Sequence, residues 1–166
     1  MKDYDGKVRV VYKNMIVHPQ VVTKAHLAGC AAGKQGKFVE FKDKWWTDAF
    51  ANRKFDEDEI NKIAKDIGLD MTKFKADWDG ADCKKLVADD ASELAKFHVN
   101  STPSFFINGQ HVGGALPKDN FKQIIDAKLK IAEASGVTGA EYYDKEIMGK
   151  GEKQFRSKKD PKPAGH

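Results

Sequence analysis

A short segment in the second half of the chain, residues 99–114, constrains the fold more than any other. Thr102-Pro103 leads into the largely apolar residues Ser104–Ile107, and Asn108-Gly109 is the dipeptide that favours positive φ at the tip of a two-residue turn. A second short strand follows and ends at Gly113-Gly114. The segment therefore predicts a β-hairpin that is entered through a proline.

The rest of the chain predicts one more strand and a series of helices. Residues 7–13 alternate at first and are rich in β-branched side chains, which predicts a strand that ends at Asn14. Apolar residues spaced three and four apart predict helices over residues 19–33, 38–50, 57–67, 71–79, 82–98, 117–136 and 138–148. A strand, a helical region and a parallel return strand form a βαβ unit, so both predicted strands are expected in one sheet. The sequence thus predicts an α/β domain with a helical insertion at about residues 37–98.

The length and the charge distribution exclude several classes of protein. The 166 residues suit one domain, expected over residues 1–149 and followed by a basic flexible tail over residues 150–166. The net charge of +4 is carried by this tail, which leaves the body neutral and without a concentrated basic face. No apolar run is long enough to span a membrane, and no apolar segment of the signal-peptide type follows Met1. We therefore expect neither nucleic acid nor a membrane as a partner.

The two cysteines do not have the spacing of a redox-active pair. Cys30 falls late in a predicted helix among small residues, as a small buried side chain would. Cys83 falls in the first turn of a helix, where the pKa of a thiol can be lowered, and is the candidate nucleophile, although Asp79 and Asp82 oppose that shift. A Cys30–Cys83 disulfide also fits their spacing and would be structural. The five histidines lack metal-ligand spacing, so neither a metal nor a cofactor is predicted.

Several segments, taken in order, resemble the DsbA-like thioredoxin-fold family of thiol–disulfide oxidoreductases. They are residues 6–14, His18-Pro19, residues 34–38 and residues 102–109, and the resemblance extends over about residues 4–134. In that family the bond matching Thr102-Pro103 is cis and lies beside a redox-active Cys-x-x-Cys. The same loop presents a backbone edge to an extended peptide or to a thiol substrate such as glutathione. The resemblance thus implies that Ser101, Thr102 and Pro103 bind substrate.

Complete members of the family carry a central strand and a Cys-x-x-Cys helix start ahead of the segment that matches residues 6–14. This sequence contains neither, so we expect a thioredoxin-like sheet that is shortened at its N-terminus. Loss of a central strand leaves two strand edges unpaired, and each buried unpaired backbone group costs about 1–3 kcal/mol. We therefore expect a rearranged sheet, in which residues 7–13 and 104–107 pair with each other, or a homo-oligomer in which a second copy covers the gap.

Three functions remain open at this stage. The first is that of a DsbA-like thiol–disulfide oxidoreductase domain without dithiol activity of its own. The second is a noncatalytic module for peptide binding or oligomerisation that uses the Thr-Pro loop and the exposed strand edges. The third is a glutathione-binding relative of the kappa-type transferases. Complete relatives act in the periplasm or cell envelope, whereas this sequence shows no export signal.

Overall fold

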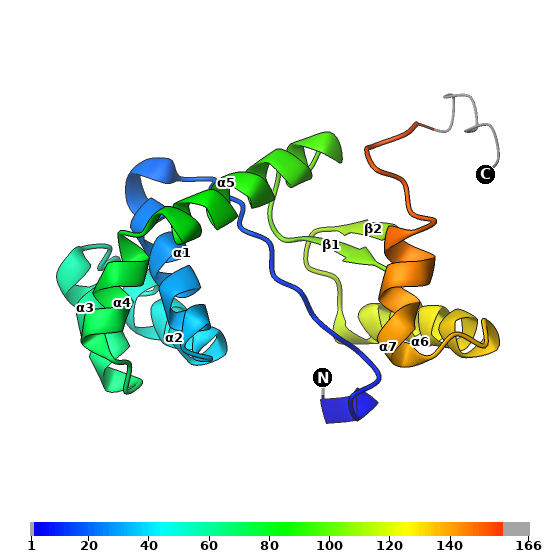
Figure 1. Cartoon of the computed structure of the whole chain (residues 1–166), viewed down its shortest axis with the longest axis horizontal. Helices are drawn as coiled ribbons and strands as arrows, with labels where there is room; N and C mark the ends of the chain where they lie inside the picture. Colours follow the sequence, from blue (N-terminus) through cyan, green and yellow to red (C-terminus); the bar gives the residue numbers. More distant parts are fainter. Residues whose placement is uncertain (1, 158–166) are drawn as a thin grey trace. The chain divides into compact units, whose positions relative to one another are not determined.

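The computed structural model describes residues 2–157 and divides into two compact units (Figure 1). The helical unit comprises Lys13–Glu93, and the hairpin unit comprises Met1–Tyr12 together with Leu94–His166. The α/β class is confirmed, because a small two-stranded sheet accompanies a mostly helical chain. The predicted division into a domain over residues 1–149 and a tail stays a prediction, and residues 158–166 of that tail lie outside the described residues.

The predicted helices of the first two thirds of the chain are present. They are α1 (Pro19–Lys34), α2 (Phe38–Lys44), the π-helical segment η2 (Trp45–Phe50), α3 (Glu57–Asp66), α4 (Met71–Trp78) and α5 (Ala81–Lys96). Two of them begin at aspartates whose side chains accept hydrogen bonds from the first turn. Asp56 accepts from the Glu59 N–H at 2.8 Å, and Asp70 accepts from the Thr72 and Lys73 N–H groups. These acceptors satisfy donors that a helix start leaves free.

The core of the helical unit lies where α1 to α4 pack together, the blue to green helices of Figure 1. Phe74 is fully buried and its ring lies 6.3 Å from that of Phe41 and 5.5 Å from that of Trp78, between ring centroids. Four alanines of α1 are buried, which lets the neighbouring helices approach that helix closely. The core residues are Ala25, Ala28, Ala31, Ala32, Phe41, Trp45, Ala49, Ile60, Ile63, Ala64, Leu69, Phe74 and Trp78.

The hairpin unit contains the predicted hairpin and the helices that follow it. Strands β1 (Ser104–Ile107) and β2 (Gln110–Gly113) pair antiparallel, with Ser104 opposite Gly113 and Ile107 opposite Gln110. Asn108 and Gly109 have φ of 42° and 82°, as the turn chemistry predicts. The other elements are η1 (Lys2–Tyr4), α6 (Lys118–Ala134), α7 (Gly139–Tyr142) and η3 (Tyr143–Met148).

The prediction of a strand over residues 7–13 is wrong. This segment has no regular secondary structure, and the sheet of the described residues consists of β1 and β2 alone. A strand requires a hydrogen-bonded neighbour, and neither β1 nor β2 pairs with this segment. The expected rearrangement, in which residues 7–13 close against residues 104–107, is therefore not formed.

Within residues 2–157, no helix combines the length and the apolar character that crossing a bilayer requires.

Candidate functional site

The predicted substrate-binding residues form an exposed loop at the start of β1. Ser101, Thr102 and Pro103 are all exposed, and the Thr102-Pro103 peptide bond is cis. The Ser104 hydroxyl donates a hydrogen bond of 2.8 Å to the carbonyl oxygen of Ser101, which ties the loop to the first residue of the strand. The structure gives the N–H of Thr102 no acceptor among the described residues.

The strand that follows this loop has an open edge. The Gly114 N–H donates to the Pro103 carbonyl at 2.8 Å, which makes these two residues a hydrogen-bonded pair. Hydrogen-bonded pairs alternate along an antiparallel ladder. The backbone N–H and C=O groups of Phe105 and Ile107 therefore point toward β2, whereas those of Ser104 and Phe106 point away from it. Among the described residues no strand covers that edge. The loop and the strand therefore present one continuous backbone edge.

Aromatic side chains cover both faces of the hairpin. On one face, the Phe106 ring lies 5.7 Å from that of Phe97 and 5.1 Å from that of His111, between centroids. On the other face, Phe105 packs edge-on against Phe121 of α6 at 4.8 Å. Both strand phenylalanines remain exposed, with 38% of Phe105 and 45% of Phe106 accessible. These contacts fix the strand without hiding its edge.

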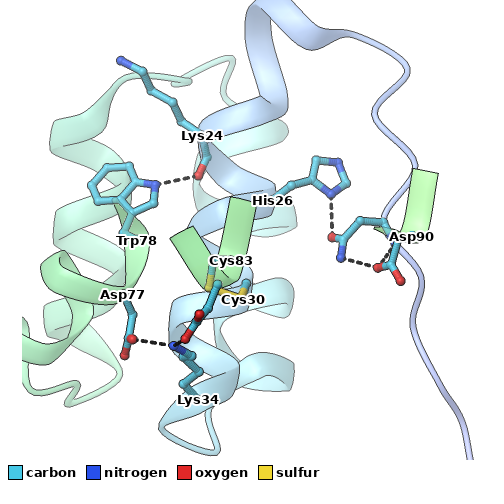
Figure 2. Close-up of a disulfide and its surroundings, with 10 residues drawn as sticks. Lys24, His26, Cys30, Lys34, Asp77, Trp78, Cys83 and Asp90 are labelled. Carbon is cyan, nitrogen blue, oxygen red and sulfur yellow. Dashed lines mark hydrogen bonds and ion pairs between the residues drawn. A yellow bond between two sulfur atoms is a disulfide. The ribbon is translucent and has the colours of Figure 1, made fainter. Parts of the chain in front are cut away.

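The two cysteines are joined in a disulfide between α1 and α5, which Figure 2 shows. Cys83 is fully buried and Cys30 is half-buried. Cys83, the candidate nucleophile, therefore offers no thiolate in this structure. Its place in the first turn of α5 serves the disulfide instead.

A lysine beside the disulfide links α1 to two other parts of the helical unit. The Lys34 ammonium lies 2.7 Å from a carboxylate oxygen of Asp77 and 2.9 Å from one of Asp82 (Figure 2). The hydrogen bond to Asp77, followed by that to Asp82, raises the pKa of Lys34 above its ordinary value. This cation neutralises the aspartate that precedes Cys83.

A buried carboxylate, which sequence reasoning did not single out, anchors the chain where it enters the helical unit. Asp90 of α5 is 3% exposed and accepts hydrogen bonds from the backbone N–H and the Nδ2 group of Asn14, at 2.9 and 2.7 Å. The Lys13 ammonium lies 3.0 Å from its other oxygen. Nδ1 of His26 lies 2.9 Å from Oδ1 of Asn14 and completes the network (Figure 2). Because Asp90 lies on a helix with many other charged residues, no local signal marks it as buried.

The half-buried position of His26 predicts a pH dependence of stability. Desolvation lowers the pKa of His26 below its ordinary value of 6.5, so the unfolded chain binds a proton more readily than the folded one. The stabilising contribution is present above pH 6.5 and is lost as the pH falls through the lowered pKa. We expect the free energy of unfolding, measured in urea, to fall between neutral pH and about pH 5, and to fall less in His26→Gln, which keeps a donor for Asn14. An equal decrease in both proteins would contradict this assignment.

An open pocket of about 390 Å³ lies at the surface of the helical unit, between α1, α3 and the end of α4. Its lining includes Leu27, Trp78 and Asn61, and the Trp78 indole N–H donates to the Lys24 carbonyl at 2.9 Å. The Asn61 amide nitrogen donates to the Glu57 carbonyl, but its Oδ1 is buried without a hydrogen-bond partner among the described residues. An unsatisfied buried acceptor lowers stability by about 1–3 kcal/mol.

This orphaned acceptor predicts a stabilising substitution. Asn61→Leu removes the unsatisfied oxygen and places an apolar side chain of similar size beside Leu27 and Trp78. We expect the free energy of unfolding in urea to rise by about 0.5–1.5 kcal/mol, since leucine also favours the helix. Asn61→Asp is the matched control, because it keeps the shape and adds a carboxylate oxygen in place of the amide nitrogen. A decrease in stability for Asn61→Leu would show that Oδ1 is satisfied in solution.

Among residues 2–157 no cluster of three or more His, Cys, Asp or Glu side chains could hold a metal ion.

Comparisons with known proteins identify the family. A family model described as Thioredoxin matches residues 1–127. The chain is 29% identical over 136 residues to the probable disulfide bond formation protein D of Bacillus cereus, covering 75% of this chain and 60% of that protein. It is 26% identical over 127 residues to the Na(+)/H(+) antiporter NhaA of Herminiimonas arsenicoxydans, covering 76% of this chain and 20% of that protein. The chain thus spans less than two thirds of each relative's length, and no solved structure matches it. Since the family match covers well over half of its residues, the chain belongs to the thioredoxin-fold, DsbA-like family.

Proposed function

We propose that this chain binds an extended peptide at the Ser101–Pro103 loop, as the substrate-binding part of a DsbA-like domain. The observation that carries the proposal is the backbone edge of this exposed loop, where the Thr102 N–H has no acceptor among the described residues. An extended peptide laid along such an edge gains main-chain hydrogen bonds, while its side chains contact the surface on either side. The exposed rings of Phe105 and Phe106 supply apolar surface on both faces for those contacts.

The proposal assigns no dithiol exchange to the two cysteines of this sequence. Exchange begins with an accessible thiolate that attacks a disulfide sulfur, and Cys83 is both fully buried and bonded to Cys30. The disulfide instead stabilises the helical unit. Such a bond persists in an oxidising compartment, which is consistent with action in the periplasm or cell envelope.

The cysteine assignment is tested by catalysed thiol–disulfide exchange on a reduced, unfolded protein substrate. We expect the chain and its Cys30→Ser/Cys83→Ser variant to give the same rate as the uncatalysed reaction. A rate above that background that disappears in the double variant would make one of these cysteines a nucleophile. It would contradict the noncatalytic assignment.

Peptide binding at the loop is tested by fluorescence anisotropy. The probe is a fluorescein-labelled peptide of alternating valine and threonine with a central serine, which cannot exchange disulfides. Thr102→Pro removes the uncommitted N–H of the loop, and we expect it to weaken binding about tenfold, equivalent to one lost hydrogen bond of about 1.4 kcal/mol. Gln110→Ala is the control, because Gln110 lies on β2 at the end of the hairpin opposite to the loop. This variant should bind the peptide as the unmodified chain does.

The same titration separates the alternatives. Binding of reduced glutathione in competition with the peptide, and lost in Thr102→Pro, would favour the glutathione-binding alternative for the same loop. Equal binding of the peptide by Thr102→Pro and by the unmodified chain would contradict the loop as its site.

A further inference from the structure

Residues 152–157, which belong to the hairpin unit, cross the end of α5 (Figure 1). The Phe155 N–H donates a hydrogen bond of 2.7 Å to the carbonyl oxygen of Lys96, the last residue of α5. The Phe155 ring stacks on the ring of His98, with 4.6 Å between the centroids and 27° between the planes. This segment, which we call the strap, is thus fastened to α5 by its backbone and by an aromatic side chain.

Both fastenings of the strap use the polarity of helix ends. The last carbonyl groups of a helix have no partner within it and form the negative end of its dipole. The Lys96 carbonyl accepts from the Phe155 backbone, and the Met148 carbonyl at the end of η3 accepts from the Lys153 ammonium. A main-chain hydrogen bond beside an aromatic contact is also what an extended peptide forms with its receptor. The strap therefore holds α5 in the way that a peptide ligand would.

The strap lies within reach of a peptide bound at the Ser101–Pro103 loop. Thr102 follows His98 by four residues, so their Cα atoms are at most about 14 Å apart. An extended peptide of nine residues spans about 30 Å, or about 15 Å to either side of its centre. A peptide centred on Thr102 is therefore long enough for its flank to reach His98.

We propose that the strap is an autoinhibitory element of this peptide site. When it is docked, Phe155 occupies the Lys96 carbonyl and the His98 ring. When it is released, these two groups form a subsite for an aromatic residue in the flank of a bound peptide, since stacked rings add affinity beyond the area that they bury. This role rests on the proposed peptide binding at the loop and adds to it a preference for an aromatic residue.

Docking of the strap is tested by trypsin cleavage after Lys153 and Arg156, followed by mass spectrometry. His98→Asn removes the stacked ring, and asparagine tolerates the left-handed backbone of this position, where φ is 54°. Because cleavage requires the strap to open, we expect this variant to be cut about threefold faster or more at both bonds. His111→Asn is the matched control, since it removes an exposed histidine ring that contacts Phe106 instead, and it should be cut at the unmodified rate.

Autoinhibition is tested by fluorescence anisotropy with two fluorescein-labelled peptides of nine residues. Both alternate valine and threonine around a central serine, and one carries phenylalanine at both ends. Phe155→Ala releases the strap, and we expect it to bind the phenylalanine peptide about three- to tenfold more tightly than the unmodified chain does. Addition of His98→Asn to Phe155→Ala should abolish this gain. Gln154→Ala is the matched control, because it changes the exposed neighbour of Phe155 and should leave the affinity unchanged.

The two measurements separate failure of the strap from failure of the loop. Equal cleavage rates of His98→Asn and His111→Asn would show that the strap is not docked, which overturns autoinhibition and leaves peptide binding at the loop untouched. Equal affinity of Phe155→Ala and the unmodified chain for the phenylalanine peptide would also overturn it. If no chain bound either peptide, the proposed function would fail, and autoinhibition with it.

Discussion

Replacing Cys30 and Cys83 together by serine will lower the free energy of unfolding by about 4 kcal/mol. The two residues are 53 positions apart, and the disulfide between them encloses α2, α3 and α4. Closing a loop of this length removes much of the conformational entropy of the unfolded chain, which is the main source of the expected effect. Burial of a serine hydroxyl in place of the fully buried Cys83 sulfur adds to the loss.

The measurement is equilibrium unfolding in urea, followed by tryptophan fluorescence, because Trp45 and Trp78 both lie in the core of the helical unit. The unmodified chain with its disulfide reduced is the second reference, since it lacks the bond but keeps the cysteine side chains. We expect its stability to approach that of the double variant. A double variant within about 1 kcal/mol of the oxidised chain would show that the bond is absent or without effect in solution.

Asp90→Ala will lower the free energy of unfolding by about 3–5 kcal/mol, because it leaves the groups that surround a buried carboxylate without their acceptor. The Asn14 N–H and Nδ2 groups both donate to this carboxylate, and Lys13 pairs with it. Lys13 keeps its second partner, Glu93, at 2.7 Å, but the two donors of Asn14 lose theirs.

Glu93→Ala is the matched control, since it removes the exposed partner of the same lysine. Exposed ion pairs contribute little, and we expect a change within about 1 kcal/mol. Asp90→Asn should fall between the two, because its amide keeps one acceptor oxygen. Thermal and urea unfolding of the three variants provide the comparison, and equal stabilities of Asp90→Ala and Glu93→Ala would contradict a structural role for the buried network.

The features that were predicted correctly from the sequence are those that depend on residues close together in the chain. Asn108-Gly109 predicted the hairpin turn, and apolar spacing predicted the helices over residues 57–67 and 71–79, because turns and helices depend on residues close together in the chain. The prediction of a strand over residues 7–13 was wrong because strand formation depends on a distant part of the chain. Its composition favours a strand, but a strand forms only where a distant segment supplies hydrogen bonds.

The candidate site shows the same division. Ser101, Thr102 and Pro103 could be placed at the entrance of the hairpin from the turn that follows them. The Cys30–Cys83 bond stayed one of several readings, because spacing does not determine which helices meet. The burial of Asp90 could not be predicted, since it depends on Asn14, which is distant in the sequence, binds Asp90 and is itself bound by His26.

The salt bridge between Lys13 and Glu93 joins the first and the last residue of the helical unit. A module whose entry and exit points are this close can be lengthened, exchanged or removed while the flanking chain is reconnected by a short linker. The helical unit is therefore suited to transfer as a cassette, and recombination between relatives could alter it without changing the hairpin that carries the Thr-Pro loop.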